Sequence, residues 1–121
     1  MSFCVVAGAV ALRFAATAFT LGWTHSVEGA RWEEDWRVTP AGLEITEARV
    51  RGSGAGMEPG EDATLRDGWW RWRPASPPIP ELLLAASGAT QGGWELCADG
   101  ACRSLGAAPG PPVRIAPCGG P

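Results

Sequence analysis

The stretch "FTLGWTHSVEGARWEEDW", residues 19–36, decides the fold class because apolar and polar residues alternate on both sides of a short central break. Odd positions from 19 to 27 share one face of a predicted strand, and even positions from 32 to 38 share one face of the next. Gly29 and Ala30 suit a type II′ turn, which takes glycine at its first central position. The stretch therefore predicts a β-hairpin with one apolar face.

The turn also predicts the register of this hairpin. With Gly29 and Ala30 at its tip, His25 lies opposite Glu34 and Trp23 lies opposite Trp36. The chain's single histidine would then form a cross-strand pair with a carboxylate on a face lined by tryptophan.

The rest of the chain continues the same pattern of short strands and turns. Strands are predicted within residues 3–8, 9–14, 43–51 and 81–87, and the shift of the apolar positions between Ile45 and Ala48 predicts a β-bulge. Other segments are predicted as a glycine loop (52–62), a turn (66–68), an extended proline-rich connection (74–80) and a closing strand, "PVRIAPC" (112–118).

The length and composition favour one globular domain. The chain has 121 residues, 17 glycines and 11 prolines, a pattern of many turns and few long helices. We expect a single all-β domain over residues 1–121, an antiparallel β-sandwich or partly open barrel of about eight to ten short strands.

The apolar N-terminus resembles a signal peptide or a membrane span only in composition. It has no basic region ahead of the apolar run, and Gly8, Arg13 and Thr17 divide the run into pieces too short to span a bilayer. We interpret it as strands, and expect no signal peptide within this chain.

The charge pattern predicts no nucleic-acid partner. All ten basic residues are arginine, they are scattered along the sequence, and the formal net charge is -3. A nucleic-acid surface would need a basic patch.

The four cysteines predict two disulfides in an oxidising compartment. Asp99 and Gly100 form a strong hairpin-turn signal that places Cys97 opposite Cys102, at a separation that a disulfide can bridge. Cys4 and Cys118 would then pair near the two termini. Four reduced thiols in the cytosol are the alternative. A zinc site lacks a second close cysteine pair or a nearby histidine, so we expect neither metal nor cofactor.

His25 and Glu34 form the first candidate site. Glu34 would orient His25 and raise its pKa, so that the imidazole binds an anion or relays a proton. The alternative is a structural pair, a partly buried histidine held by a carboxylate.

The loop "RGSGAGME", residues 51–58, is the second candidate. It lacks the lysine and the following helix of a phosphate loop, but its successive backbone N–H groups would suit a carboxylate or phosphate. Arg49 or Arg51 would supply positive charge. The alternative is a tight bulged corner that needs glycine for its backbone angles.

Other chemistries fit the sequence less well. A hydrolase would use Ser26 or Ser53 as nucleophile with His25 as base, but Ser26 faces away from His25 and Ser53 lacks a strand-to-helix elbow. A metal site of His25 with scattered glutamates is generic. The seven tryptophans could line a sugar-binding surface or form core.

The segments "FTLGWTHSVEGARWEEDWRV", "GLEITEARVRGSGAGMEP" and "DGWWRW" followed by "PELLLA" resemble the bacterial family known as domain of unknown function 1850. Such proteins often carry an N-terminal signal or membrane anchor and are often encoded beside TRAP-type solute transporters of the TAXI class. The resemblance implies a periplasmic or otherwise extracytoplasmic β-domain that is an accessory of such a transporter or acts in its regulation, with membrane contact only through a partner. The candidate residues themselves suggest a small organic anion as ligand, with Arg49 or Arg51 as its counter-charge.

We therefore expect a non-enzymatic accessory or ligand-sensing domain. The alternatives are a small His25-dependent hydrolase or lyase, and a scaffold that docks on protein through residues 69–80. The predicted ligand-binding residues are His25, Ser26, Glu28, Glu34, Arg49, Arg51, Ser53, Gly54, Gly56 and Glu58.

Overall fold

The computed structural model describes residues 1–24, 29–51, 62–88 and 91–119, which contain eleven strands. The strands are β1 (Ser2–Ala7), β2 (Val10–Phe14), β3 (Ala18–Thr24), β4 (Arg31–Thr39), β5 (Gly42–Arg51), β6 (Thr64–Arg66), β7 (Trp69–Trp72), β8 (Leu82–Ala86), β9 (Gln91–Ala98), β10 (Ala101–Leu105) and β11 (Gly110–Cys118). No helix in these ranges is long and apolar enough to cross a membrane.

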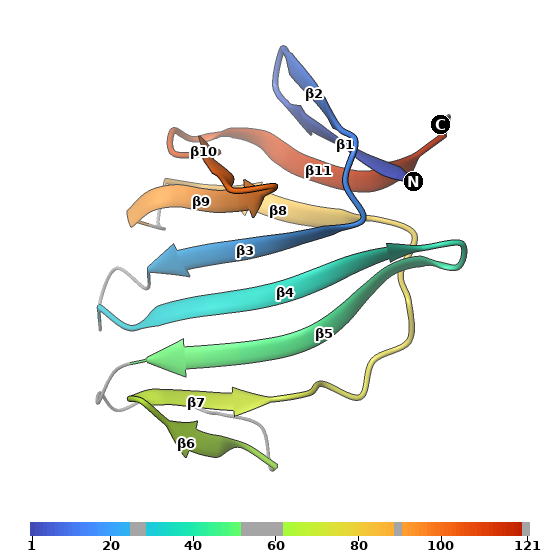
Figure 1. Ribbon diagram of the computed structural model, residues 1–121. Helices are drawn as coiled ribbons and strands as arrows, with labels where there is room; N and C mark the ends of the chain where they lie inside the picture. The colour runs from blue at the N-terminus through green and yellow to red at the C-terminus, as the bar shows by residue number, and fades with distance from the viewer. Residues whose placement is uncertain (25–28, 52–61, 89–90, 120–121) are drawn as a thin grey trace.

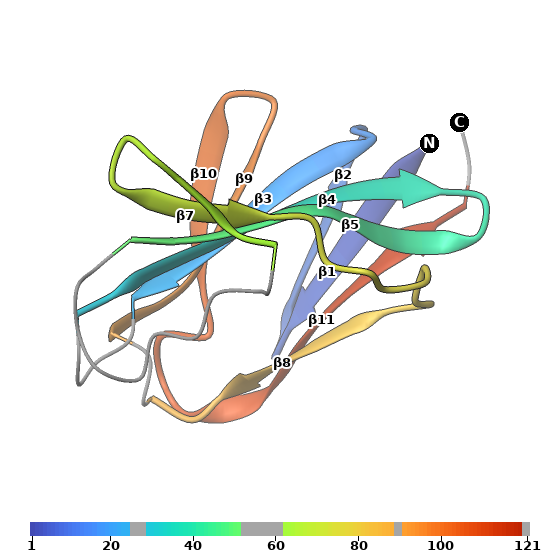
Figure 2. The same cartoon turned by 90° about the horizontal axis from the view of Figure 1, so that it is seen from below.

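The strands form two antiparallel sheets, which are packed as a sandwich and are not closed into a barrel (Figures 1 and 2). One sheet has the order β2-β1-β11-β8 and the other the order β10-β9-β3-β4-β5-β7-β6. The predicted all-β class is confirmed, with eleven strands in the described ranges where eight to ten were expected.

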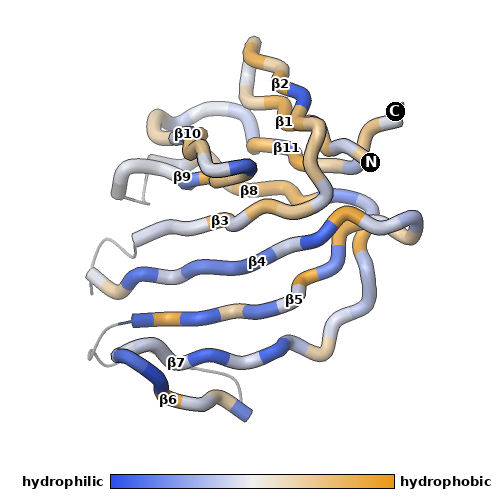
Figure 3. The backbone as a smooth tube through the Cα atoms, viewed as in Figure 1, coloured by the Kyte–Doolittle hydropathy of each residue, from blue (hydrophilic) through white to orange (hydrophobic). Residues whose placement is uncertain are grey.

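The core lies between the two sheets and follows the alternation seen in the sequence. Phe3 on β1 and Phe19 on β3 join the sheets with ring centroids 4.7 Å apart, and Leu21, Leu96 and Ile115 are almost completely buried. Hydrophilic residues are instead concentrated along β4, β5, β7 and β6 (Figure 3). The seven-stranded sheet therefore has an apolar inner face and a charged outer face.

The predicted register of the first large hairpin is wrong. Trp23 lies opposite Trp32 and stacks on it at 6.2 Å, while Glu34 lies opposite Leu21 instead of His25. The predicted and observed registers put the same residues on the same face, so alternation could not distinguish them. His25 itself lies outside the described residues.

The predicted bulge is confirmed on β5. Asp35 pairs with Glu47 and Trp36 pairs with Ile45, which leaves Thr46 as the extra residue. The Thr46 hydroxyl donates a hydrogen bond to the Asp35 carbonyl oxygen at 3.2 Å. The bulge explains why the buried positions on β5 change from odd to even numbers along the strand.

Two tight turns close the hairpins at the ends of the seven-stranded sheet. In each turn an aspartate and a glycine have positive φ, 54° and 84° at Asp67 and Gly68, and 52° and 78° at Asp99 and Gly100. Such values at both central residues are those of a type I′ turn. Both predicted turns are thus confirmed.

Both predicted disulfides are present. Cys97 and Cys102 join β9 to β10 across the second turn, with Cα atoms 4.0 Å apart. Cys4 and Cys118 join β1 to β11, with a sequence separation of 114 residues. One disulfide therefore closes almost the whole chain and the other closes a single hairpin.

The proline-rich connection between β7 and β8 bonds to β5 through Ile79. The backbones of Ile79 and Leu43 exchange two hydrogen bonds of 2.7 and 2.9 Å. This bridge anchors the connection where the chain crosses from one sheet to the other.

Candidate functional site

The seven-stranded sheet separates the predicted site residues. Glu34 lies opposite Leu21 and Ala48, which are buried on the inner face, whereas Arg49 lies opposite Glu33 on the outer face and forms an ion pair with it. Alternation places Arg51 on the same outer face. Glu34 therefore shares no face with either arginine. The remaining predicted ligand-binding residues lie outside the described ranges, and they are His25, Ser26, Glu28, Ser53, Gly54, Gly56 and Glu58.

Glu34 is a partly buried carboxylate with an indole as its hydrogen-bond partner. Trp36 Nε1 donates to Glu34 Oε1 at 3.1 Å. Burial raises the pKa of Glu34 above its ordinary value, and the hydrogen bond from Trp36 offsets part of that rise. Ionisation of this side chain therefore costs the folded state stability.

The tryptophans of the inner face mainly extend the core. Trp23, Trp72 and Trp94 are partly buried and pack against the core cluster. Trp23 contacts Trp94 at 5.0 Å, and Trp32 contacts Trp72 edge to face at 6.2 Å. This packing accounts for these rings without a sugar ligand.

Arg49 is the centre of the outer face. Its guanidinium donates to Glu33 at 3.0 Å, to Glu47 at 2.6 Å and to Asp35 at 2.8 and 3.3 Å. The side chain is only 13% exposed. Three carboxylates from two strands thus already surround Arg49. Because its donors are taken up by these partners, Arg49 is poorly placed to contact a ligand.

Two pKa shifts follow from this network. Burial alone would raise the pKa of Asp35, but hydrogen bonds from Arg49 and Thr20 and the charges of Arg49 and Arg71 lower it below its ordinary value. Burial lowers the pKa of Arg49, and its bonds to Asp35, Glu47 and Glu33 outweigh that effect and raise it. Asp35 and Arg49 therefore stay ionised at neutral pH.

Arg51 has a different environment from Arg49. Its guanidinium lies 4.8 Å from the ring centroid of Trp69, in a cation–π arrangement, and the guanidinium of Arg49 lies 6.0 Å from the same ring. Arg51 is exposed and has no carboxylate partner among the described residues. Of the two arginines predicted as the counter-charge, Arg51 is the accessible one.

The fold gathers on one corner several arginines that are dispersed in the sequence. The turn at Asp67 and Gly68 places Thr64 opposite Arg71 and Arg66 opposite Trp69. Arg71 also lies opposite Arg49, because β7 pairs with β5. Half of the ten arginines thus belong to the outer face of this corner or continue it, namely Arg49, Arg51, Arg66, Arg71 and Arg73.

Three of these arginines, Arg66, Arg71 and Arg73, border an open groove of about 570 Å³ on the outer face. Its lining residues are Asp35, Thr46, Glu47, Asp62, Thr64, Arg66, Arg71, Trp72 and Arg73. A volume of this size is within the range of sites that bind small molecules.

The charges in the groove are not equally available. Asp35 and Glu47 already accept hydrogen bonds from Arg49, and Arg71 donates to Glu47 at 3.1 Å. Arg66 and Arg73 are exposed, and neither has a carboxylate partner among the described residues. Within the described part of the chain, the groove therefore presents two guanidinium groups without an ion-pair partner, and Asp62 is its carboxylate outside the Arg49 network.

Arg71 has one further donor, which is buried rather than open to the groove. The Nε atom of Arg71 is buried and has no hydrogen-bond partner among the described atoms. Thr64 carries a hydroxyl and lines the same groove, whereas the hydroxyl of Thr46 already donates to the Asp35 carbonyl oxygen. Guanidinium and hydroxyl donors that converge on one groove suit a carboxylate or a similar oxyanion.

Sequence reasoning missed Arg66, Arg71 and Arg73, although a signal was present. In "TLRDGWWRWR", residues 64–73, alternation on both sides of Asp67 and Gly68 puts every arginine on one face. What the sequence did not show was that this hairpin pairs with β5, which brings Arg49 and Arg51 to the same face.

Comparison with known proteins identifies a family. The family model described as "Domain of unknown function (DUF1850)" matches residues 19–105. No curated protein and no solved structure matches the chain. The matched residues run from β3 to the end of β10, so they include the arginine-lined groove.

Proposed function

The chain belongs to the family called domain of unknown function 1850, and we propose that it is a non-enzymatic ligand-sensing domain that binds a small organic anion. The proposed site is the groove between β5 and the β6–β7 hairpin. The observation that carries this proposal is the pair of exposed arginines, Arg66 and Arg73, which border the groove without a carboxylate partner among the described residues.

The electrostatics of the groove favour binding over catalysis. A general acid or base works best when its pKa lies near the working pH. The pKa of Asp35 is instead lowered, and both Asp35 and Glu47 are held by Arg49. These carboxylates are suited to fixing Arg49 and Arg71 in place, while Arg66 and Arg73, which have no carboxylate partner among the described residues, supply donors for an oxyanion.

We place this domain outside the cytoplasm of a bacterium, as an accessory of a TRAP-type transporter of the TAXI class. The two disulfides are compatible with an extracytoplasmic location. The role beside a transporter rests on the genomic neighbourhood that the family resemblance implies. A sensor of small carboxylates would suit a transporter of organic acids.

A thermal-shift screen tests the binding proposal. The oxidised protein is heated with acetate, succinate, glutamate or inorganic phosphate, and so is the Arg66→Gln/Arg73→Gln variant. A ligand present at 100 times its Kd should stabilise the parent by about 2.7 kcal/mol. We expect at least one carboxylate to raise the melting temperature of the parent and to leave that of the variant unchanged.

Two control variants locate the site. Arg103→Gln removes an exposed arginine of β10, which lies outside the groove, and should retain the shift. His25→Ala should also retain it. If His25→Ala abolishes the shift and Arg66→Gln/Arg73→Gln does not, the ligand binds at the histidine and the groove proposal is wrong.

A further inference from the structure

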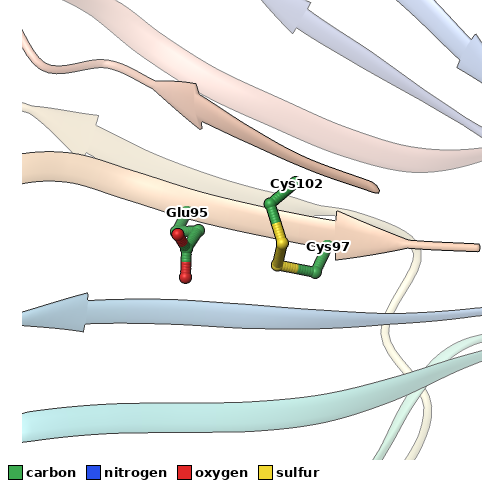
Figure 4. Close-up of side chains that lie close together, drawn as sticks. All are labelled: Glu95, Cys97 and Cys102. Carbon is green, nitrogen blue, oxygen red and sulfur yellow. A yellow bond between two sulfur atoms is a disulfide. The ribbon is translucent and has the colours of Figure 1, made fainter. Parts of the chain in front are cut away.

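The hairpin formed by β9 and β10 brings together three side chains that can ligate a metal. Glu95 and Cys97 come from β9 and Cys102 comes from β10 (Figure 4). One carboxylate oxygen and the two sulfur atoms all lie within 4.8 Å of one another. Among the described residues, these three form the group of histidine, cysteine and acidic side chains whose ligand atoms lie close enough together to hold one metal ion.

The strands set this arrangement independently of the disulfide. Cys97 lies opposite Cys102 because the turn at Asp99 and Gly100 determines the register of the hairpin. Alternation puts Glu95 on the same face of β9 as Cys97. On its other side β9 pairs with β3, and Leu96 between the two ligands is fully buried. The three side chains should therefore still face one another after the disulfide is opened.

The group is accessible from solvent. Glu95 and Cys102 are exposed, and Cys97 is partly buried. Cys97 also lines a second open groove of about 510 Å³, together with Thr20, Asp35 and the turn residues 98–100. A small reductant and a hydrated cation can both approach the sulfur atoms from this side.

The two disulfides should contribute different amounts to the stability of the fold. The bond between Cys97 and Cys102 spans 5 residues of sequence, whereas that between Cys4 and Cys118 spans 114. A short closed loop restricts the unfolded chain much less than a long one. Opening the hairpin disulfide should therefore cost little stability, and the fold should survive its reduction.

Glu95 is held at present by an arginine that has a second partner. Arg31 Nη2 donates to Glu95 at 2.6 Å, and Arg31 Nε donates to Glu33 at 3.2 Å. When Glu95 turns toward a cation, Arg31 keeps its bond to Glu33. The exchange therefore leaves no unpaired arginine.

We propose that reduction converts this hairpin into a binding site for a thiophilic divalent cation such as Zn²⁺ or Cd²⁺, with Cys97, Cys102 and Glu95 as ligands. Two thiolates on a tetrahedral zinc ion lie about 3.8 Å apart at the usual Zn–S distance of about 2.3 Å. Sulfur atoms on residues with Cα atoms 4.0 Å apart can take that separation. The carboxylate is the third ligand, and water fills the fourth position from the open groove.

The reaction balances with a small-molecule dithiol as reductant. The dithiol gives two electrons to the bond between Cys97 and Cys102 and leaves as its own disulfide, and its two protons pass to the two sulfur atoms. The cation then binds two thiolates and releases these protons to solvent. The disulfide and the bound metal are thus alternative states of one hairpin.

A cadmium titration tests this proposal. The full chain is treated with a mild dithiol, and alkylation with mass spectrometry identifies which cysteines are reduced. Cd²⁺ is then added while the ultraviolet charge-transfer absorption of cadmium thiolate is recorded. We expect one Cd²⁺ per reduced chain, with this absorption missing from the oxidised chain and from Cys97→Ser/Cys102→Ser, which retains the other disulfide.

Glu95→Gln and a matched control separate the carboxylate from general surface charge. Glu95→Gln should weaken cadmium binding at least about tenfold, the loss that even outer partners of a metal site produce. Glu44→Gln removes an acidic residue from the same outer face, where it pairs with Arg37, and should change nothing. Tryptophan fluorescence reports whether each reduced protein is folded.

Each contrary result overturns a defined part of the proposal. Charge-transfer absorption that persists in Cys97→Ser/Cys102→Ser assigns the metal to other thiols. A reduced parent that shows no such absorption has no site. Equal affinity in Glu95→Gln removes the carboxylate from the ligand set, and a reduced parent that unfolds contradicts the claim that the strands hold the site together.

Discussion

Glu34 and Asp35 are neighbours on β4, and yet their carboxyl groups are in opposite environments. Asp35 faces outward and accepts hydrogen bonds from Thr20 and Arg49, and its pKa is lowered. Glu34 faces inward and accepts a bond from Trp36, and its pKa is raised because burial dominates. One step along a strand thus changes a carboxylate from a stabilising to a destabilising group.

The difference comes from which residues the neighbouring strands provide. On the outer face, β5 places Arg49 where it reaches three carboxylates. On the inner face, β3 and β5 place Leu21 and Ala48 beside Glu34. The outer face is therefore held by a shared ionic network, and the inner face is held by apolar packing.

The largest expected effect is on the inner face. Leu21→Ala removes an almost fully buried side chain beside Glu34 and should cost about 3 kcal/mol of unfolding free energy, a typical value for a cavity in a core. Thr20→Ala, one residue earlier, removes a hydrogen bond to Asp35 and should cost about 1 kcal/mol. Urea unfolding compares them, and equal losses would contradict the division between the two faces.

Loss of the central arginine comes next. Arg49→Met leaves Glu33, Asp35 and Glu47 close together without their shared cation and should cost about 2 kcal/mol at pH 7, after allowance for solvent screening. Arg37→Met removes an exposed arginine with one partner, Glu44, and should cost less than about 0.5 kcal/mol. Chemical denaturation measures both, and a cost for Arg49→Met as small as that for Arg37→Met would rule out a structural network.

Protonation of Asp35 in acid should lower the stability of the folded protein. Its pKa is lower in the folded protein than in the unfolded chain, so the stability that it contributes is full above the unfolded value near 3.8 and is lost as the pH falls through the folded value. Asp35→Asn should therefore be less stable than the parent at pH 7 and should converge with it in strong acid. Melting temperatures between pH 7 and pH 2 test this, and parallel curves would contradict it.

The smallest expected change in stability is a gain, and it comes from replacing Glu34. The pKa of Glu34 is higher in the folded protein than its ordinary value of 4.5, so ionisation destabilises the fold as the pH rises through the folded value. Glu34→Gln should raise the melting temperature by a few degrees at pH 7, with no gain near pH 4 and below. A loss of stability at pH 7 would instead show that the Glu34 charge has a partner.

Local patterns in the sequence predicted much of this fold. Alternation identified the strands, the Asp-Gly pairs at residues 67–68 and 99–100 identified two turns, and the second turn led to the disulfide between Cys97 and Cys102. The shifted apolar positions around Thr46 identified the bulge. Each of these features depends on residues that are close together along the chain.

Features that depend on distant pairing could not be predicted in the same way. The register of Trp23 against Trp32 differs from the predicted one by a slip that preserves both faces, so the hydrophobic pattern is equally satisfied. The arginine-lined groove requires β7 to pair with β5, and no local signal in the residues determines that neighbour. The candidate site therefore depends on which strands are neighbours in the sheet, and that order is seen only in the structure.

We propose that Arg66 and Arg73 hold a small carboxylate in the outer-face groove. Isothermal titration of succinate into the parent, Arg66→Gln/Arg73→Gln and Arg103→Gln measures this directly, at two salt concentrations. We expect saturable binding to the parent and to Arg103→Gln, weaker at higher salt, and at least a tenfold loss of affinity in the double variant. Equal binding to all three proteins, or binding to none, would contradict it.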